Sequence, residues 1–134
     1  MNIKWVYWIA TGLLSLMYVG AGLMYLFNIS LVQGMFGNFG YPAYVVPILG
    51  VVKLIAAATI LSRFSVALSD LAYAGMFFHL ILAASAHIGI ADWAGLPPSV
   101  VGLVLLSVSF LTQNRVRSKP SPYGSPAALR GSAA

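Results

Sequence analysis

The chain has 134 residues, of which 60% are hydrophobic and only 7% are charged. A soluble domain of this size needs more polar surface, so the composition excludes one and indicates that lipid surrounds the protein. The net charge is +5, but four of the seven basic residues lie in the last 20 positions, a pattern that indicates membrane topology rather than nucleic-acid binding. Cysteine is absent, which excludes thiol nucleophiles, disulfide relays, thiolate metal sites and c-type haem attachment.

The first apolar run covers residues 5–27. A secretory signal peptide with a cleavage site near Gly20 is one interpretation of this start. The apolar core of a signal peptide is only about 7 to 15 residues long, however, and this run is longer. We therefore expect a membrane-spanning helix.

Three further apolar runs cover residues 43–61, 66–88 and 96–112. A helix needs about 17 to 25 residues to cross a hydrocarbon core about 30 Å thick, and every run has that length. The runs lack the strict alternation of barrel strands, so helices must satisfy the backbone hydrogen bonds in lipid. The sequence predicts an all-α fold, an integral membrane four-helix bundle over residues 1–113. A disordered basic tail rich in Ser, Pro, Gly and Ala is expected over residues 114–134.

The long connection between the first two spans, residues 28–42, contains three glycines at positions 34, 37 and 40. This spacing disfavours a long helix but permits a short turn that lies on the membrane. We expect the segment to cap the outer end of the bundle.

The positive charges favour one orientation. Lys4 precedes the first predicted span, Arg63 lies between the second and third, and the tail after the fourth holds most of the remainder. The other two connections contain no Lys or Arg. Because cytoplasmic segments carry an excess of Lys and Arg, we expect both termini in the cytoplasm.

Lys53 lies near the middle of the second predicted span. A lysine at the bilayer centre costs about 2.5 to 3.5 kcal/mol, so it normally faces protein or water, or snorkels toward the interface. One interpretation is a binding or proton-handling group. The other is a lysine that snorkels or bonds a backbone carbonyl and serves packing alone.

The third predicted span carries Tyr73, His79 and His87. Reflecting the second and third spans about their connecting turn places Lys53 and His79 at the same depth, where the two side chains can meet. If they touch, at least one is expected to be neutral at pH 7, because adjacent cations repel. A histidine that only hydrogen-bonds within the packing is the alternative for His79, and His87 is expected near the outer interface.

The two histidines are eight positions apart, about 12 Å of helical rise, which is too far for both to ligate one iron. No Cys, Asp or Glu stands beside them in the sequence, so no metal site is predicted. A haem site with a single histidine, or one built across subunits, stays open as an alternative.

Asp70 stands just inside the start of the third span, where its charge complements a helix N-terminus. Pairing with Arg63, or control of access to Lys53, is the functional alternative.

Five short segments carry a further signal: Val19-Gly20-Ala21-Gly22-Leu23-Met24, Tyr41-Pro42, Ile48-Leu49-Gly50-Val51-Val52-Lys53-Leu54, Asp70-Leu71-Ala72-Tyr73-Ala74-Gly75 and Ala86-His87. With them, residues 7–112 resemble the DoxX-like family of small four-helix bacterial membrane proteins. The resemblance implies a multi-pass protein of the bacterial inner membrane, in a family whose namesake is linked to quinol-oxidising respiratory complexes. Carried over position by position, the matching residues are Lys53, Asp70, Tyr73 and His87. The chain departs from the family at Tyr25, where relatives often have a basic residue, and at Leu71, where an aromatic residue is expected.

Three hypotheses for function follow. The first is an accessory or quinone-interacting subunit of a membrane oxidoreductase, in which Lys53, Tyr73 and His87 donate hydrogen bonds to a quinone headgroup. The second is a non-enzymatic helper that assembles partner membrane proteins, or self-associates, through faces of small residues. The third, small-molecule export, needs a carboxylate within the membrane, and neither Asp70 nor Asp92 lies deep enough. No nucleophile, base and orienting group can be placed together, so a stand-alone enzyme is not expected.

Overall fold

The computed structural model describes residues 2–124 of the chain. This part is all-helical and contains no strand. Its elements in chain order are α1 (Ile3–Phe27), α2 (Ile29–Phe39), α3 (Val45–Ser62), α4 (Val66–Gly89), α5 (Pro97–Thr112) and the 3-10 helix η1 (Gln113–Arg115). The helices α1, α3 and α4 are long and apolar enough to cross a membrane, and three of the predicted spans fall on them.

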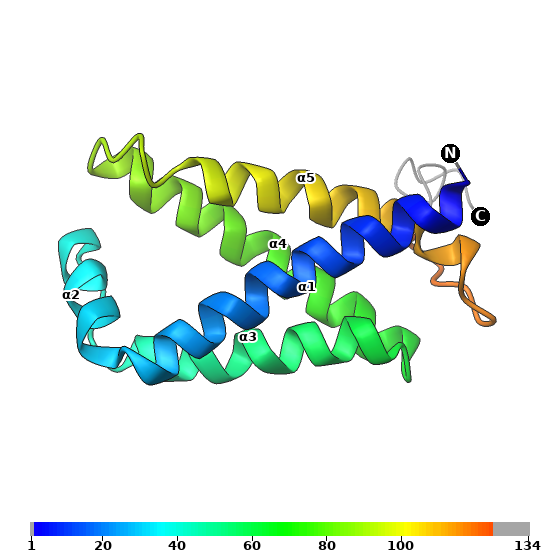
Figure 1. Ribbon diagram of the computed structural model, residues 1–134, viewed down its shortest axis with the longest axis horizontal. Coiled ribbons are helices and arrows are strands. Elements are labelled where there is room, and N and C mark those ends of the chain that lie inside the picture. Colours follow the sequence, from blue (N-terminus) through cyan, green and yellow to red (C-terminus); the bar gives the residue numbers. More distant parts are fainter. Residues whose placement is uncertain (1, 125–134) are drawn as a thin grey trace.

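The four longer helices run side by side along the long axis of the molecule, and α2 lies across one end (Figure 1). α1 packs mainly against α3 and α5, while α4 contacts α5 and, more sparsely, α3. The start of α1, the α3–α4 turn and η1 share one end of the bundle (Figure 1). The opposite end holds α2 and the α4–α5 turn.

Glycines allow the backbones of α1 and α3 to approach closely. A Cβ atom on Gly22 of α1 would lie 3.0 Å from the carbonyl oxygen of Gly50 in α3. A Cβ atom on Gly50 would in turn lie 3.0 Å from the side chain of Leu26. Small residues at such crossings let helices gain dispersion contacts, which drive packing where lipid removes the hydrophobic force between helices.

The bundle has a small interior and a large apolar exterior. The buried hydrophobic core consists of Leu14, Tyr18, Ala57, Ile60, Tyr73, Met76, Leu80 and Leu106. Large apolar side chains such as Leu16, Phe27 and Phe78 are instead exposed on the outside of the helices. A surface of this kind is stable against hydrocarbon rather than water, as the composition predicts.

The structure corrects the short turn expected over residues 28–42, because 11 of these residues form the helix α2. Val32 of α2 is buried, and the ring of Phe36 packs edge-on against that of Tyr25 in α1 with 5.5 Å between centroids. This packing outweighs the low helix propensity of the glycines. Gly40 then ends the helix in the left-handed region, at φ 85°.

The tail also differs from the expectation of disorder from Asn114 onward, because residues up to Gly124 fold back onto the bundle. The Asn114 side chain donates through Nδ2 to the Ser121 carbonyl and accepts from the Ser121 backbone N–H, both at 2.8 Å. Ser121 Oγ donates to Asp70 Oδ2 at 2.8 Å. These contacts are polar, so apolar content could not reveal them. Residues 125–134 of the predicted tail lie outside the described residues.

Candidate functional site

Lys53 of α3 and His79 of α4 meet between their helices, as their equal depth suggested. Lys53 Nζ lies 3.0 Å from His79 Nε2. The lysine is only 5% exposed, and Gly50 and Ala57, one turn away on either side, are buried on the same face of α3. Small neighbours therefore let α3 turn this lysine into the bundle rather than toward lipid.

Tyr18 of α1 extends this pair into a chain of hydrogen bonds. Its Oη lies 2.9 Å from His79 Nδ1 and donates its proton to the Met76 carbonyl at 3.3 Å. A hydrogen bond between Lys53 Nζ and His79 Nε2 needs an acceptor on one side, so the two groups cannot both be protonated. The pair therefore holds at most one positive charge. We call these three residues, Tyr18, Lys53 and His79, the donor triad.

The amino group of Lys53 has aromatic rings rather than a carboxylate as neighbours. Nζ lies 4.7 Å from the ring centroid of Tyr18 and 5.1 Å from that of Tyr25, distances at which a cation is attracted to a ring face. The chain contains two acidic residues, Asp70 and Asp92, and both bond to other partners. Apart from His79, no hydrogen-bond acceptor within residues 2–124 binds Nζ. Within these residues the lysine therefore retains N–H groups that no second acceptor binds.

The donor triad lines a cavity of about 390 Å³ between α3 and α4. Apart from these three residues and Thr59, the wall is apolar. Ile55 on one side is 59% exposed and Leu71 on the other is 67% exposed, so the cavity opens sideways between the two helices.

A second cavity of about 400 Å³ adjoins the first toward α2, and Leu49, Gly75 and His79 line both. Its wall is rich in aromatic side chains: Tyr25, Phe36, Phe39, Tyr41 and Phe78. We call the two cavities together the α3/α4 groove. It is an apolar channel with its hydrogen-bonding groups near the middle.

A family match accompanies this geometry. The model of the DoxX-like family matches residues 9–109. The chain belongs to the DoxX-like family. The match covers the donor triad and all of α2, α3 and α4, and it confirms the resemblance drawn from the sequence motifs. No curated protein and no solved structure matches the chain. Family membership, with three helices able to span a bilayer, makes this DoxX-like chain a multi-pass membrane protein.

Tyr73 of the DoxX-like chain lies apart from the donor triad. Its Oη is 2.6 Å from Ser109 Oγ, which is itself 2.6 Å from Thr11 Oγ1. These buried bonds join α4, α5 and α1. Tyr73 and Asp70 also line a separate cavity of about 440 Å³ between α4 and α5. The structure therefore does not place Tyr73 beside Lys53.

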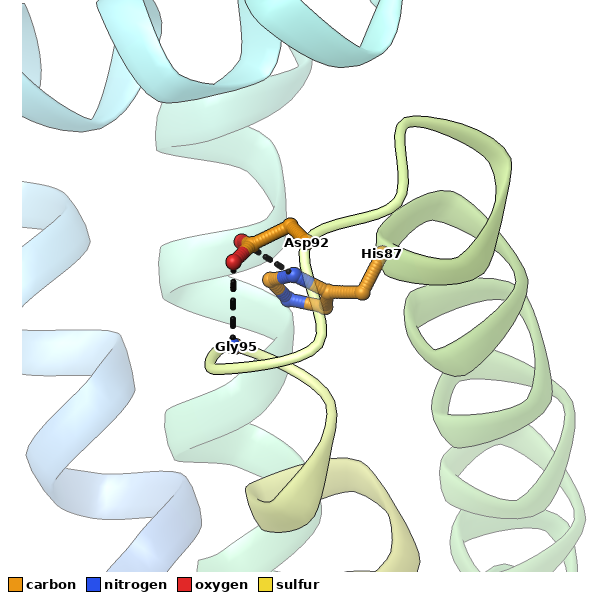
Figure 2. A network of polar contacts seen from close by, with 3 residues as sticks. All are labelled: His87, Asp92 and Gly95. Carbon is orange, nitrogen blue, oxygen red and sulfur yellow. Dashed lines mark hydrogen bonds and ion pairs between the residues drawn. The ribbon is translucent and has the colours of Figure 1, made fainter.

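His87 closes the α4–α5 turn at the far end of the α3/α4 groove. Its Nδ1 lies 2.9 Å from Asp92 Oδ2, and Asp92 Oδ1 accepts the backbone N–H of Gly95 at 3.1 Å (Figure 2). The Phe39 ring of α2 packs edge-on against the imidazole, with 4.9 Å between centroids. A side chain at Gly95 would collide with the imidazole and with Asp92. His87 thus holds the turn through Asp92 and also lines the groove.

Asp70 hydrogen-bonds to residues after α5 and not to Lys53. It accepts hydrogen bonds from Ser121 Oγ at 2.8 Å and from Gln113 Nε2 at 3.5 Å. Arg63, considered above as its partner, donates instead to the Val116 carbonyl at 2.8 Å. Within residues 2–124 no three His, Cys, Asp or Glu side chains gather to form a metal site.

Sequence reasoning missed Tyr18 and the role of Asp92. Tyr18 stands in an apolar helix among other aromatic residues, so no pattern marks it as the partner of His79. Asp92 carried a usable signal, because a carboxylate five residues after a histidine at a helix end is within reach of that histidine across the turn.

Proposed function

We propose that this protein binds a lipophilic ligand of the quinone class in the α3/α4 groove, as an accessory subunit of a membrane oxidoreductase. The observation that carries the proposal is the donor triad, which lines an otherwise apolar groove open to lipid. A quinone has the matching chemistry, because its carbonyl oxygens accept hydrogen bonds while its tail is hydrocarbon.

Lys53 is the proposed donor to a quinone carbonyl. Its free N–H groups need an acceptor, since a buried donor without a partner is costly in a bilayer. His79 and Tyr18 position the amino group, because the chain of bonds that they form ends at the Met76 carbonyl. The aromatic half of the groove offers faces on which a quinone ring can stack, and the apolar walls suit an isoprenoid tail.

Three residues that the sequence predicted as ligand contacts do not donate to the quinone in this proposal: Tyr73, Asp70 and His87. Tyr73 and Asp70 support the bundle and its tail, while His87 borders the aromatic half of the groove. The chain would bind and orient the ligand, and electron transfer would belong to the partner oxidoreductase.

We also propose that the protein crosses a bacterial inner membrane four times, with both termini in the cytoplasm. α5 has 16 residues and no charge, and at 1.5 Å per residue it is about 24 Å long before η1 extends it. Arg63 stacks over Trp8 near the start of α1 at 4.9 Å and bonds to Val116 after η1. Basic segments that are distant in sequence thus share one end of the bundle (Figure 1), as the positive-inside rule requires.

Reporter fusions test the topology. Fusions in the α3–α4 turn and after η1 should report the cytoplasm, whereas a fusion in the α4–α5 turn should report the opposite side. Fusions that place the two termini on different sides would contradict the four-span arrangement.

Quinone binding is tested with purified protein in a mild detergent. Solvent extraction should recover quinone, and a soluble decyl-quinone should raise the melting temperature. Lys53→Met should weaken this binding about tenfold or more, because it removes a hydrogen bond to an amino group. Lys4→Met is the matched control, since Lys4 is exposed at the end of α1, and it should bind as the wild type does. Absence of both extracted quinone and a thermal shift would overturn the proposal, and a shift with fatty acid alone would overturn the ligand class.

A further inference from the structure

A polar cleft of about 610 Å³ lies where the α3–α4 turn meets the folded tail, away from the α3/α4 groove. Three cationic side chains line it: Arg63, Arg117 and Lys119. Neither of the two carboxylate side chains of the chain does. We call this the basic cleft, and it shares no lining residue with the groove.

The arginines of the basic cleft are held in place by neutral groups. Arg63 ends α3 in the left-handed region, and its guanidinium bonds the Val116 carbonyl and stacks over Trp8. Arg117 Nε donates to Gln113 Oε1 at 3.0 Å. These partners orient the guanidinium groups without neutralising them. Among the described residues, the cleft therefore concentrates positive charge, and no carboxylate occupies its N–H donors.

The start of α4 adds to the positive electrostatic potential of the basic cleft. Ser65 caps the helix, and Ser65 and Val66 both line the cleft. The partial positive charge at a helix N-terminus favours an anion at the same place as the three cationic side chains.

Phe64 indicates the depth of the cleft in the membrane. It lines the cleft between the spanning helices α3 and α4, and its side chain is 69% exposed. An exposed phenylalanine at the ends of two spanning helices suits the boundary between headgroups and acyl chains. An anion bound here would carry hydrocarbon beside it.

We propose that the basic cleft binds the phosphate of an anionic membrane lipid. The guanidinium groups and Lys119 engage the phosphate, and Phe64 lies against the acyl chains. The folded tail completes the site, because Arg117 and Lys119 reach it only when residues 114–124 dock on the bundle. This site is independent of the quinone proposal.

The test measures binding to the full chain in non-ionic detergent with three probes: dihexanoyl phosphatidylglycerol, dihexanoyl phosphatidylcholine and inorganic phosphate. Lys119→Gln and Arg117→Gln should each weaken phosphatidylglycerol binding about fivefold, the effect of one cation near a lipid surface. Arg115→Gln is the matched control, because Arg115 is exposed in the same segment but does not line the cleft. It should change the affinity less than twofold. Lys119 is itself exposed, so its replacement leaves the fold intact.

Three outcomes would overturn the proposal. Equal weakening by all three substitutions would show that net charge alone attracts the lipid. Equal affinity for phosphatidylcholine would show that the cleft does not select anionic headgroups. Inorganic phosphate that binds as tightly as phosphatidylglycerol would show a site for the free anion rather than for a lipid.

Discussion

Tyr73→Phe removes one hydroxyl from the buried chain of hydrogen bonds that joins α4, α5 and α1. Ser109 Oγ still has Thr11 Oγ1 at 2.6 Å after this change, so no partner is left unpaired. One lost bond lowers the free energy of unfolding by about 0.5 to 1.5 kcal/mol, and bonds between spanning helices average about 0.6 kcal/mol. We expect a loss near the lower end of this range.

Ser109→Ala breaks both bonds and leaves the Tyr73 and Thr11 hydroxyls without this partner. An unsatisfied buried group costs about 1 to 3 kcal/mol, so this variant should lose at least twice as much stability as Tyr73→Phe. The double variant should be more stable than Ser109→Ala alone, because Tyr73→Phe removes a hydroxyl that the serine substitution leaves unpaired. Unfolding in mixed micelles, followed by tryptophan fluorescence, measures all three.

Quinone affinity decides whether this network is structural. Tyr73→Phe should bind decyl-quinone as the wild type does, because Tyr73 lies outside the donor triad. If Tyr73→Phe kept full stability and lost quinone affinity as Lys53→Met does, the assignment of Tyr73 to the bundle interior would be refuted.

Three further substitutions test packing, the α4–α5 turn and the tail. Gly22→Ala places a Cβ 3.0 Å from a backbone oxygen of α3 and should lower the unfolding free energy by about 1 to 3 kcal/mol, whereas Gly12→Ala, with nothing within 4 Å, should be tolerated in the same unfolding assay. Asp92→Asn removes the carboxylate that bonds His87, so amide hydrogen exchange should become faster within the α4–α5 turn and not in α1. Unchanged exchange would show that the His87–Asp92 pair does not hold the turn. Ser121→Ala removes the hydroxyl that donates to Asp70, so trypsin should cleave after Arg117 about five to ten times faster. An unchanged cleavage rate would show that this hydrogen bond does not hold the tail on the bundle.

The length of the apolar runs in the sequence made much of the architecture predictable. Runs of suitable length with few charges gave α1, α3 and α4 close to their observed bounds. The same runs gave the depth of each polar residue, so the meeting of Lys53 and His79 could be anticipated from one reflection about the α3–α4 turn.

Rotation about the helix axis was not predictable. These helices are apolar on most sides, so no hydrophobic stripe marks the face that points inward. Tyr73 and His79 stand on one helix, yet only His79 reaches Lys53, and Tyr18 enters the site from a helix with no distinguishing pattern. The tail was missed for a different reason, because its docking depends on polar pairs such as Asn114 with Ser121.

Photo-labelling with a light-activated quinone tests most directly whether the donor triad holds a ligand headgroup. Mass spectrometry of the labelled protein should find the adducts on α3 and α4 residues that line the groove, such as Leu49 and Gly75. Excess decyl-quinone should compete with the label, and Lys53→Met should reduce it about tenfold. Adducts spread over all lipid-facing helices, or labelling that Lys53→Met leaves unchanged, would contradict the account.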